Sequence, residues 1–267
     1  MAQERSQPND RGMRGRTIPA PSIGTLYIVS TPIGNPDDMT LRALATLRHV
    51  MVVASEDPRA TQALLAHHGI TATVTSYGPS NLHEKMQLLL DRLMQGQDVA
   101  LVSDNGTPVI YDPGSLLVAA AHRAGIPVKA VPGPSTMTAA AAISGFSGDA
   151  IIFEGHLPST SHRLAQCLVQ LRNERRTLVF YVGSRALTRL LKILAQLLPI
   201  RQMAIAIDLT TCREMLYRGR PGELLGRIGP VPKDSAVTVV IEGYGAGSHT
   251  KPMRRKMPRA TRLRGGG

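Results

Sequence analysis

The feature that most constrains the fold is a repeated alternation between short apolar runs and helical patterns. Each of five β-type runs in the first half of the chain is followed by an amphipathic segment, with short connections between them. Three helical segments stop at Gly69, Gly96 or Gly125, and glycine readily adopts the left-handed conformation that ends a helix. This repeat predicts an α/β unit with a largely parallel sheet.

The second half of the chain predicts a mixed α/β domain instead. In the first half, strands are expected at 25–30, 50–54, 72–76, 98–103 and 127–131, and helices at 40–48, 58–68, 81–95, 115–124 and 135–143. In the second half, strands are expected at 150–154, 177–182, 202–208, 214–218 and 236–242, and helices at 160–172 and 185–197. The strands at 202–208 and 214–218 suggest an antiparallel pair. We expect domains at 23–146 and 147–244, flanked by arms at 1–22 and 245–267.

Three Gly- and Pro-rich loops follow predicted strands. They are Thr31-Pro-Ile-Gly-Asn35, Ser103-Asp-Asn-Gly-Thr-Pro108 and Val131-Pro-Gly-Pro-Ser135. Loops at the carboxyl ends of parallel strands meet at one edge of the sheet, where α/β proteins bind their ligands. We therefore expect a small-molecule site formed by these loops, in a cleft between the two domains.

A charged segment also follows the second predicted strand. Asp57 precedes Pro58, so Asp57 is expected to cap the next helix. The functional alternative is that Glu56 and Asp57 form a polar pair at the site, with Arg59 beside them. Both roles remain open at this point.

The net charge of +12 is concentrated in the two arms. Residues 1–22 carry four arginines against two acids, and residues 248–267 carry seven lysines and arginines without an acid. Both arms lack a hydrophobic period, so we expect them to be disordered. Such arms suit electrostatic contact with a nucleic-acid backbone, and a solubilising role is the alternative. The candidate RNA-binding residues are Lys251, Arg254, Arg255, Lys256 and Arg259.

Several other classes are excluded by the sequence. It contains no GxxxxGK[ST] phosphate loop and no GxSxG nucleophile elbow. The two cysteines, Cys167 and Cys212, are far apart, which favours reduced thiols and a cytoplasmic protein. No membrane span, signal peptide or metal site is expected.

Five motifs, in order, resemble the signature series of the 16S rRNA cytidine-2′-O-methyltransferases of the tetrapyrrole methylase superfamily. These are Thr31-Pro-Ile-Gly-Asn35, Ser55-Glu-Asp-Pro-Arg59, Ser103-Asp-Asn-Gly-Thr-Pro108, Asp112-Pro-Gly114 and Pro132-Gly-Pro-Ser135. The resemblance runs from residue 24 to residue 243. In the second domain it is carried by Phe153-Glu-Gly-His-Leu-Pro158, Phe180-Tyr181, Tyr217-Arg-Gly219 and Ile241-Glu-Gly243.

The resemblance implies a homodimer of two-domain subunits that bind S-adenosylmethionine in the cleft. The implied activity is 2′-O-methylation of a cytidine ribose in the decoding centre of 16S rRNA. From its placement, Glu56 or Asp57 is the candidate catalytic base, and Arg59 is a candidate to steer a phosphate. The implied cofactor-binding residues are Pro32, Ile33, Gly34, Asp104, Gly106, Thr107, Ile110, Ser135, Thr136, Tyr181, Leu209 and Val237.

The second domain also departs from the family pattern. Val182-Gly-Ser-Arg-Ala186 replaces Glu-Ser-Pro-His-Arg, Ile207-Asp-Leu-Thr-Thr211 replaces Arg-Glu-Leu-Thr-Lys, and Lys233-Asp-Ser235 replaces Lys-Gly-Glu. Two alternatives therefore stay open. One is a non-catalytic RNA-binding paralogue, and the other is a small-molecule methyltransferase of the porphyrinoid-modifying kind. Methyl transfer to RNA distinguishes both from the rRNA enzyme.

Overall fold

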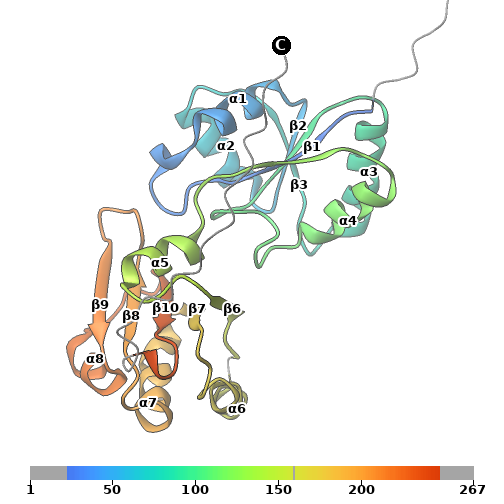
Figure 1. The fold of residues 1–267 in the computed structure, drawn as a ribbon. Coiled ribbons are helices and arrows are strands. Elements are labelled where there is room, and N and C mark those ends of the chain that lie inside the picture. Colours follow the sequence, from blue (N-terminus) through green and yellow to red (C-terminus); the bar gives the residue numbers. More distant parts are fainter. Residues whose placement is uncertain (1–22, 159, 247–267) are drawn as a thin grey trace, which may run out of the picture. The chain divides into compact units, whose positions relative to one another are not determined.

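A computed structural model describes residues 23–158 and 160–246 of the protein. The described chain forms two compact units (Figure 1). Unit 1 contains residues 23–30 and 40–132, and unit 2 contains residues 31–39 and 133–246. The expected arm at 1–22 lies outside the described residues, as does the expected tail from residue 247 onward.

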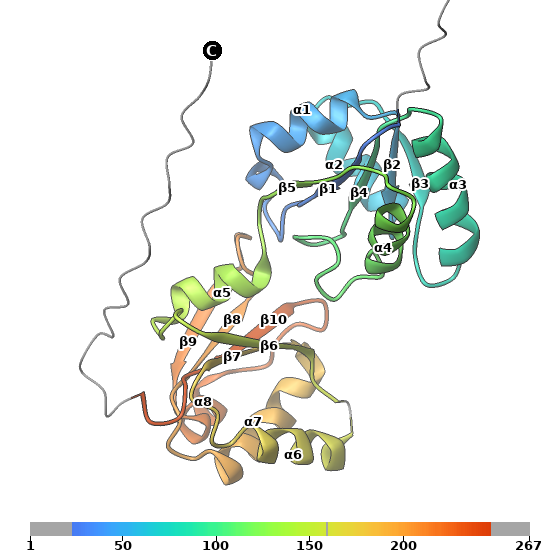
Figure 2. The same ribbon diagram turned by 45° about the vertical axis from the view of Figure 1, so that its right-hand side comes forward.

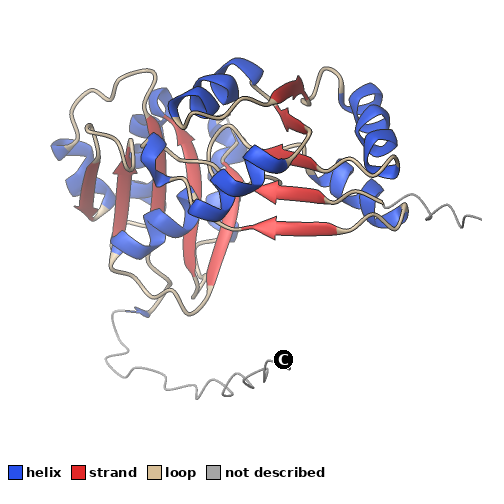
Figure 3. Ribbon diagram, turned by 90° about the horizontal axis from the view of Figure 1, so that it is seen from above, coloured by secondary structure: helices blue, strands red, loops and turns tan. Residues whose placement is uncertain are grey.

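Unit 1 is built on a parallel sheet of five strands in the order β3-β2-β4-β1-β5. Figure 3 draws the strands of the protein in red and the helices in blue. The strands are β1 Leu26–Val29, β2 Val52–Ser55, β3 Thr73–Ser76, β4 Val99–Val102 and β5 Val128–Val131. The connecting helices are α1 Leu41–His49, α2 Pro58–His67, α3 Leu82–Met94 and α4 Ser115–Arg123. The predicted parallel sheet is confirmed, because hydrophobic strands alternate with helices as the sequence indicates.

Local signals in the sequence explain where these helices begin and end. The Thr40 hydroxyl accepts the amide of Ala43 at the start of α1, and the Asp57 carboxylate caps α2 ahead of Pro58. Gly69, Gly96 and Gly125 all have left-handed φ values, of 62°, 83° and 68°. The predicted glycine stops are therefore confirmed.

The core of unit 1 is aliphatic. Leu89 and Leu93 of α3 and Leu117 of α4 are buried against the sheet. The sheet side of the cluster is formed by Leu26, Val52, Ala54, Val99 and Leu101. Every residue of the neighbouring strands β2 and β4 is buried, which is typical of central strands in a parallel sheet.

Unit 2 contains a mixed sheet of five strands in the order β6-β7-β10-β8-β9. The strands are β6 Ile151–His156, β7 Thr177–Gly183, β8 Met203–Ile207, β9 Met215–Gly219 and β10 Ala236–Ile241. β6 is parallel to β7, whereas β10 is antiparallel to both of its neighbours. The expected antiparallel pair of β8 and β9 is also present. The predicted mixed α/β class is therefore confirmed.

The helices of unit 2 cover both faces of this sheet (Figure 2). They are α5 Thr136–Ser144, α6 Ser161–Gln170, α7 Leu187–Leu197 and α8 Pro221–Arg227, with 3-10 turns at Pro36–Asp38 and Ser184–Ala186. The sequence interpretation missed the short α8. Its signals were Pro221 at the first turn and Glu223, whose carboxylate accepts the amide of Arg220.

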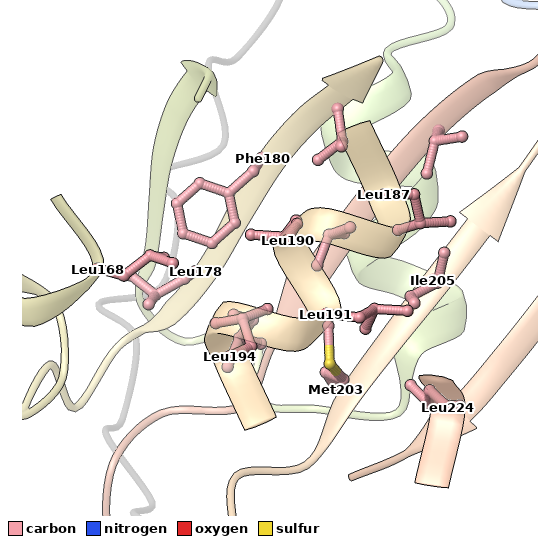
Figure 4. Close-up of a cluster of buried hydrophobic side chains, with 14 of the residues drawn as sticks. Leu168, Leu178, Phe180, Leu187, Leu190, Leu191, Leu194, Met203, Ile205 and Leu224 are labelled. Carbon is pink, nitrogen blue, oxygen red and sulfur yellow. The ribbon is translucent and has the colours of Figure 1, made fainter. Parts of the chain in front are cut away.

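Strand alternation separates two cores in unit 2. Phe180, Val239 and Ile205 point to the face covered by α6, α7 and α8. Figure 4 shows Phe180 and Ile205 together with the leucines of α7. Val179 and Val240 point to the opposite face, against Ala140 of α5. Successive residues of a strand point to opposite faces, so this alternation fixes which side chains share a face. Across the described residues, no helix is long and apolar enough to cross a membrane.

The units divide at Pro132 and Gly133, whereas the sequence suggested a boundary after residue 146. The reason is that α5 packs on the unit 2 sheet through Ala140. The segment 31–39 also belongs to unit 2, although it directly follows β1 of unit 1. Tertiary packing determines that these two segments belong to unit 2, and the local sequence pattern gives no indication of that packing.

We expect the α7 core to be sensitive to truncation. Leu190 is 2% exposed, and replacing it by alanine should leave a cavity between α7 and the sheet. The Leu190→Ala variant should lose about 2–5 kcal/mol of unfolding free energy, measured by urea denaturation. The matched change Thr188→Ala, at an exposed position of the same helix, should stay within about 0.5 kcal/mol of the native protein. Equal losses in both variants would contradict this packing.

Candidate functional site

Seven of the candidate residues belong to unit 1, and they follow two strands that pair with each other. Glu56, Asp57 and Arg59 come directly after β2. The others, Asp104, Gly106, Thr107 and Ile110, are in the loop after β4, which pairs with β2. The amide of Asp57 donates a hydrogen bond to Oδ1 of Asp104 over 3.1 Å. The structure therefore joins the two predicted motifs at the carboxyl edge of the sheet.

The loop after β4 has an unusual backbone. Gly106, Val109 and Tyr111 have φ values of 88°, 75° and 61°. A left-handed conformation is sterically unfavourable for a β-branched residue such as Val109. The same loop exposes Ile110 and Tyr111, with 43% and 62% of their surface accessible. Strain of this kind concentrates at binding sites, so the loop is a strong candidate for ligand contact.

One contact anchors the strained loop to the rest of unit 1, and another fixes the shape of its far end. The hydroxyl of Thr107 lies 3.0 Å from that of Ser30, at the end of β1. At the far end of the loop, the amide of Gly114 donates to Oδ1 of Asp112 over 2.9 Å. A Cβ at Gly114 would lie 2.6 Å from Cδ2 of Leu101, so the Leu101 side chain would have to shift to admit a larger residue there. Neither contact was among the predicted site features.

Four carboxylates crowd this edge of unit 1. Burial and the charges of Asp104 and Asp112 raise the pKa of Glu56. Burial also raises the pKa of Asp104, which the charges of Asp57 and Asp112 raise further, although the hydrogen bond from the Asp57 amide partly offsets the increase. Sequence analysis quoted Asp112 only as part of a turn motif and missed this electrostatic contribution. The crowding favours a positively charged ligand.

The two residues after β2 have different surroundings. Oδ1 of Asp57 accepts the amides of Arg59 and Ala60 over 2.9 and 3.1 Å, so the predicted capping role is confirmed. Glu56 forms no hydrogen bond or ion pair with any described residue, and the side chain of Arg59 is exposed without an acidic partner in the same range. Of the two candidate bases, Glu56 is therefore the one whose carboxylate is available.

The other eight candidates for cofactor binding belong to unit 2, where the segment 31–39 packs on the loop after β8. Any Cβ at Gly34 would overlap the carbonyl of Leu209. The next amide, that of Asn35, donates to Oγ1 of Thr210 over 2.9 Å. Ile33 packs in the same cluster as Leu209. The structure thus brings together Ile33, Gly34 and Leu209, which the resemblance named as cofactor residues.

The loop after β8 is held in its shape by Asp208, which is buried and has a φ of 49°. Its carboxylate accepts the amide of Ala236 and the hydroxyl of Ser235, both over 2.9 Å. Nε of Arg213 lies 3.4 Å from the same carboxylate. This network explains part of the departure at 207–211, because Asp208 and Arg213 form an ion pair within the loop itself. Ile207 is buried in the α7 core.

Tyr181 of β7 lies on the α5 face of the unit 2 sheet. Burial raises the pKa of its hydroxyl, and hydrogen bonds with the Thr136 side chain and the Met137 backbone partly offset this increase. The rings of Phe153 and His156 lie 4.8 and 5.7 Å from the Tyr181 ring. Burial lowers the pKa of His156. Ser135 begins α5 beside Thr136, so Ser135, Thr136 and Tyr181 share one part of unit 2.

Val237 differs from the other unit 2 candidates. Its side chain is buried in the α7 core, on the opposite face of the sheet from Tyr181. The residue paired with Tyr181 across the strands is Thr238. The predicted RNA-binding residues Lys251, Arg254, Arg255, Lys256 and Arg259 lie outside the described residues. The described residues hold no group of three or more His, Cys, Asp or Glu side chains arranged to bind a metal ion.

The carboxylate cluster leads to a prediction about pH-dependent stability. Because the pKa of Glu56 is raised from 4.5 in the folded protein, its ionised form costs stability above the raised pKa. This cost disappears at pH values below the unfolded pKa. Glu56→Gln should therefore raise the melting temperature at pH 7 by about 1–2 °C and leave it unchanged near pH 4, because solvent screens this exposed group to about 0.5 kcal/mol or less. Glu154→Gln, at an exposed position of unit 2, should show no such pH-dependent gain in differential scanning fluorimetry.

Comparison with known proteins shows the family to which this chain is similar. The tetrapyrrole (corrin/porphyrin) methylase model matches residues 25–225. Ribosomal RNA small subunit methyltransferase I of Thermotoga maritima is 39% identical over 221 residues, covering 83% of this chain and 99% of that protein. The protein of the same name from Escherichia coli O157:H7 is 39% identical over 234 residues, covering 86% of this chain and 82% of that protein.

A solved structure shows the same fold. It is the uroporphyrin-III C-methyl transferase of Thermus thermophilus complexed with S-adenyl homocysteine, with a TM-score of 0.57 and 21% identity. The match covers 82% of this chain and 97% of that chain. With its family match and its relatives at 39% identity, the chain belongs to the tetrapyrrole methylase family, in the group of ribosomal RNA small subunit methyltransferase I.

Proposed function

We propose that this protein uses S-adenosylmethionine to methylate the 2′-hydroxyl of a cytidine ribose in the decoding centre of 16S rRNA. The observation that carries this proposal is the 39% identity across 99% of a relative named for methylation of the small-subunit rRNA. The cytidine and its 2′-hydroxyl come from the motif series in the sequence. The name shared by the relatives favours an RNA acceptor over the porphyrinoid alternative.

The residues present suit S-adenosylmethionine. This cofactor carries a positive sulfonium and a positive ammonium group, and the raised pKa values of Glu56 and Asp104 mark an edge of unit 1 where a positive charge would relieve repulsion. In unit 2, the half-buried ring of Tyr181 offers apolar surface of the kind that an adenine ring needs. Gly106 has no side chain to block close approach of a ligand to its backbone.

We assign Glu56 as the base and Arg59 as the residue that steers the RNA phosphate. When bound, S-adenosylmethionine would supply the activated methyl group. A ribose hydroxyl is a weak nucleophile, so a carboxylate that can accept its proton helps the transfer. The raised pKa makes Glu56 a better proton acceptor than an ordinary glutamate. Asp57 is assigned a positioning role, because its carboxylate caps α2 and its amide holds Asp104.

The remaining assignments follow from the proposed substrate. Lys251, Arg254, Arg255, Lys256 and Arg259 would contact the phosphate backbone of the rRNA through counterion release. Location in the cytoplasm would match a ribosomal substrate. The proposed homodimer rests on the resemblance to the family.

The first prediction from the proposed function concerns cofactor binding. Gly106→Val introduces a branched side chain at a left-handed φ of 88°, in the loop proposed to hold the cofactor. Binding of S-adenosylmethionine, measured by calorimetry, should fall at least about 100-fold, because the loop must move to relieve the strain. The matched control is Gly125→Val, which has a φ of 68° and open space around its Cβ position. This control should lose stability but keep its cofactor affinity.

The second prediction tests the reaction. The native protein should transfer a labelled methyl group from S-adenosylmethionine to small ribosomal subunits that lack their 2′-O-methyl mark, and nucleoside mass spectrometry should identify 2′-O-methylcytidine. Glu56→Gln should lower kcat about 10²–10⁴-fold with little change in cofactor affinity. Arg59→Ala should mainly raise KM for the subunit. Intact cofactor binding without any methylated product would instead support the non-catalytic RNA-binding alternative.

A further inference from the structure

One region of unit 2 carries an unusual excess of positive charge. Between Gly155 and Gln202 the sequence contains eight lysines and arginines and one acid, Glu174. That acid is already paired, because Nε and Nη2 of Arg176 each lie 2.9 Å from a Glu174 carboxylate oxygen. Hydrogen bonds from Arg176 lower the pKa of Glu174 to about 2. The other cations of this region therefore have no local acid to neutralise them.

One of these cations has a structural role. Arg201 is 6% exposed, and its guanidinium donates hydrogen bonds to the carbonyl oxygens of Arg172 and Glu242. It therefore ties together the chain before β7 and the chain after β10. Of the other cations, Arg176 pairs with Glu174, and the remaining six are exposed and their side chains form no hydrogen bond or ion pair with the described residues. Their role has to be sought outside the fold of unit 2.

Four of the exposed cations lie on α6, on α7 and in the 3-10 turn that leads into α7. Figure 2 shows these helices side by side on the face of the unit 2 sheet opposite α5. Each helix follows a strand of the parallel pair β6 and β7, so both begin at the same edge of the sheet. The leucines of both helices point inward to the sheet. We name the cluster of Arg163, Arg185, Arg189 and Lys192 the α6–α7 patch.

The patch extends along one helical face. Arg189 and Lys192 are three residues apart on α7, which is the spacing of neighbours on a helix surface, and Arg185 lies in the 3-10 turn that leads into α7. The hydroxyl of Ser184 donates to the carbonyl of Lys233 over 3.0 Å, which brings the turn containing Lys233 alongside. The acid next to it, Asp234, is paired with Arg213 over 3.2 Å.

These cations do not stabilise the helices that carry them. Arg163 and Arg189 both occupy the third position of their helix, close to the positive end of the helix dipole. Neither helix has an acid in its first turn or a side-chain cap at its N-terminus. Positive charges in a first turn weaken a helix, and neighbouring like charges repel each other. Their placement makes sense if an anionic partner supplies the missing negative charge.

We propose that the α6–α7 patch binds the phosphate backbone of the substrate RNA, outside the reaction site. This inference rests on the proposed function for its choice of RNA. Several exposed cations, spaced over two adjacent helices and without interleaved acids, suit a partner with repeated phosphates. A lipid surface fits less well, because the other exposed positions of α7 hold Thr188 and Gln196 rather than large apolar side chains.

The patch is placed to hold RNA without taking part in methyl transfer. The helices α6 and α7 cover the face of the unit 2 sheet opposite Tyr181 and α5. Loss of the patch should therefore weaken RNA binding and leave cofactor binding intact. This separation allows an experiment with two independent readouts.

The test compares two triple variants of the full chain. The patch variant is Arg185→Gln, Arg189→Gln and Lys192→Gln. The control variant is Arg123→Gln, Arg172→Gln and Arg175→Gln, which removes the same charge at exposed positions outside the patch. The affinity for purified small-subunit rRNA is measured from 50 to 200 mM salt. Cofactor affinity is measured by calorimetry to confirm that each variant is folded.

The patch variant should bind rRNA at least about tenfold more weakly at low salt. Its plot of log affinity against log salt should lose roughly 2–3 of its slope, because each lost phosphate contact removes about 0.9. The control variant should keep a slope close to that of the native protein. Cofactor affinity should be the same in all three proteins.

The outcomes separate this inference from the proposed function. If the native protein methylates the rRNA and the patch variant keeps the native salt slope, the patch inference is wrong and the proposed function stands. If the native protein methylates no rRNA and yet the patch variant loses salt-dependent RNA binding, the inference stands and the proposed activity is wrong. An equal loss in both triple variants would show a general effect of net charge and overturn the patch.

Discussion

The close approach of Gly34 to the carbonyl of Leu209 is the contact on which the unit 2 part of the site depends. It draws the segment 31–39 out of the unit that contains β1 and packs it on the mixed sheet. The hydrogen bond from the Asn35 amide to Thr210 then fixes its register. The loop after β8 can present its backbone in this way because the Asp208 carboxylate fixes its shape by accepting hydrogen bonds from Ala236 and Ser235. A side chain larger than hydrogen at position 34 would separate the two segments.

The regular part of the fold could be predicted from the sequence because its signals are local. Strand periodicity, Asp57 ahead of Pro58 and the glycine stops each report the conformation of a few neighbouring residues. The short α8 was missed because its seven residues carry too little periodicity to stand out beside Pro221. The placement of α5 and of residues 31–39 in unit 2 depends on packing with residues that are distant in the sequence, so no local pattern could reveal it.

The sequence could predict which motifs form the candidate site, but not the electrostatic interactions between their residues. The motifs named Glu56, Asp104 and Gly106 correctly as neighbours of strand ends. They gave no indication that Asp112 contributes to the raised pKa of Glu56, because that effect depends on how the loop after β4 folds back. Nor could they distinguish Glu56 from Asp57. The structure shows different surroundings for the two residues, because Oδ1 of Asp57 accepts two helix amides. The departures at 207–211 likewise became interpretable only once Asp208 and Arg213 were seen to pair.

We assign function to the regions whose charges and backbone conformations destabilise the isolated protein. The carboxylates of unit 1 repel each other, and Val109 adopts a backbone conformation that costs energy. On unit 2, arginines occupy first turns that would favour acids. The signs of the two charge clusters are opposite, and each matches the charge of the partner proposed for it: a cationic methyl donor for the carboxylates and an RNA backbone for the arginines. A partner of the right charge would relieve each cluster, so binding should stabilise the fold where the isolated protein is least favourable.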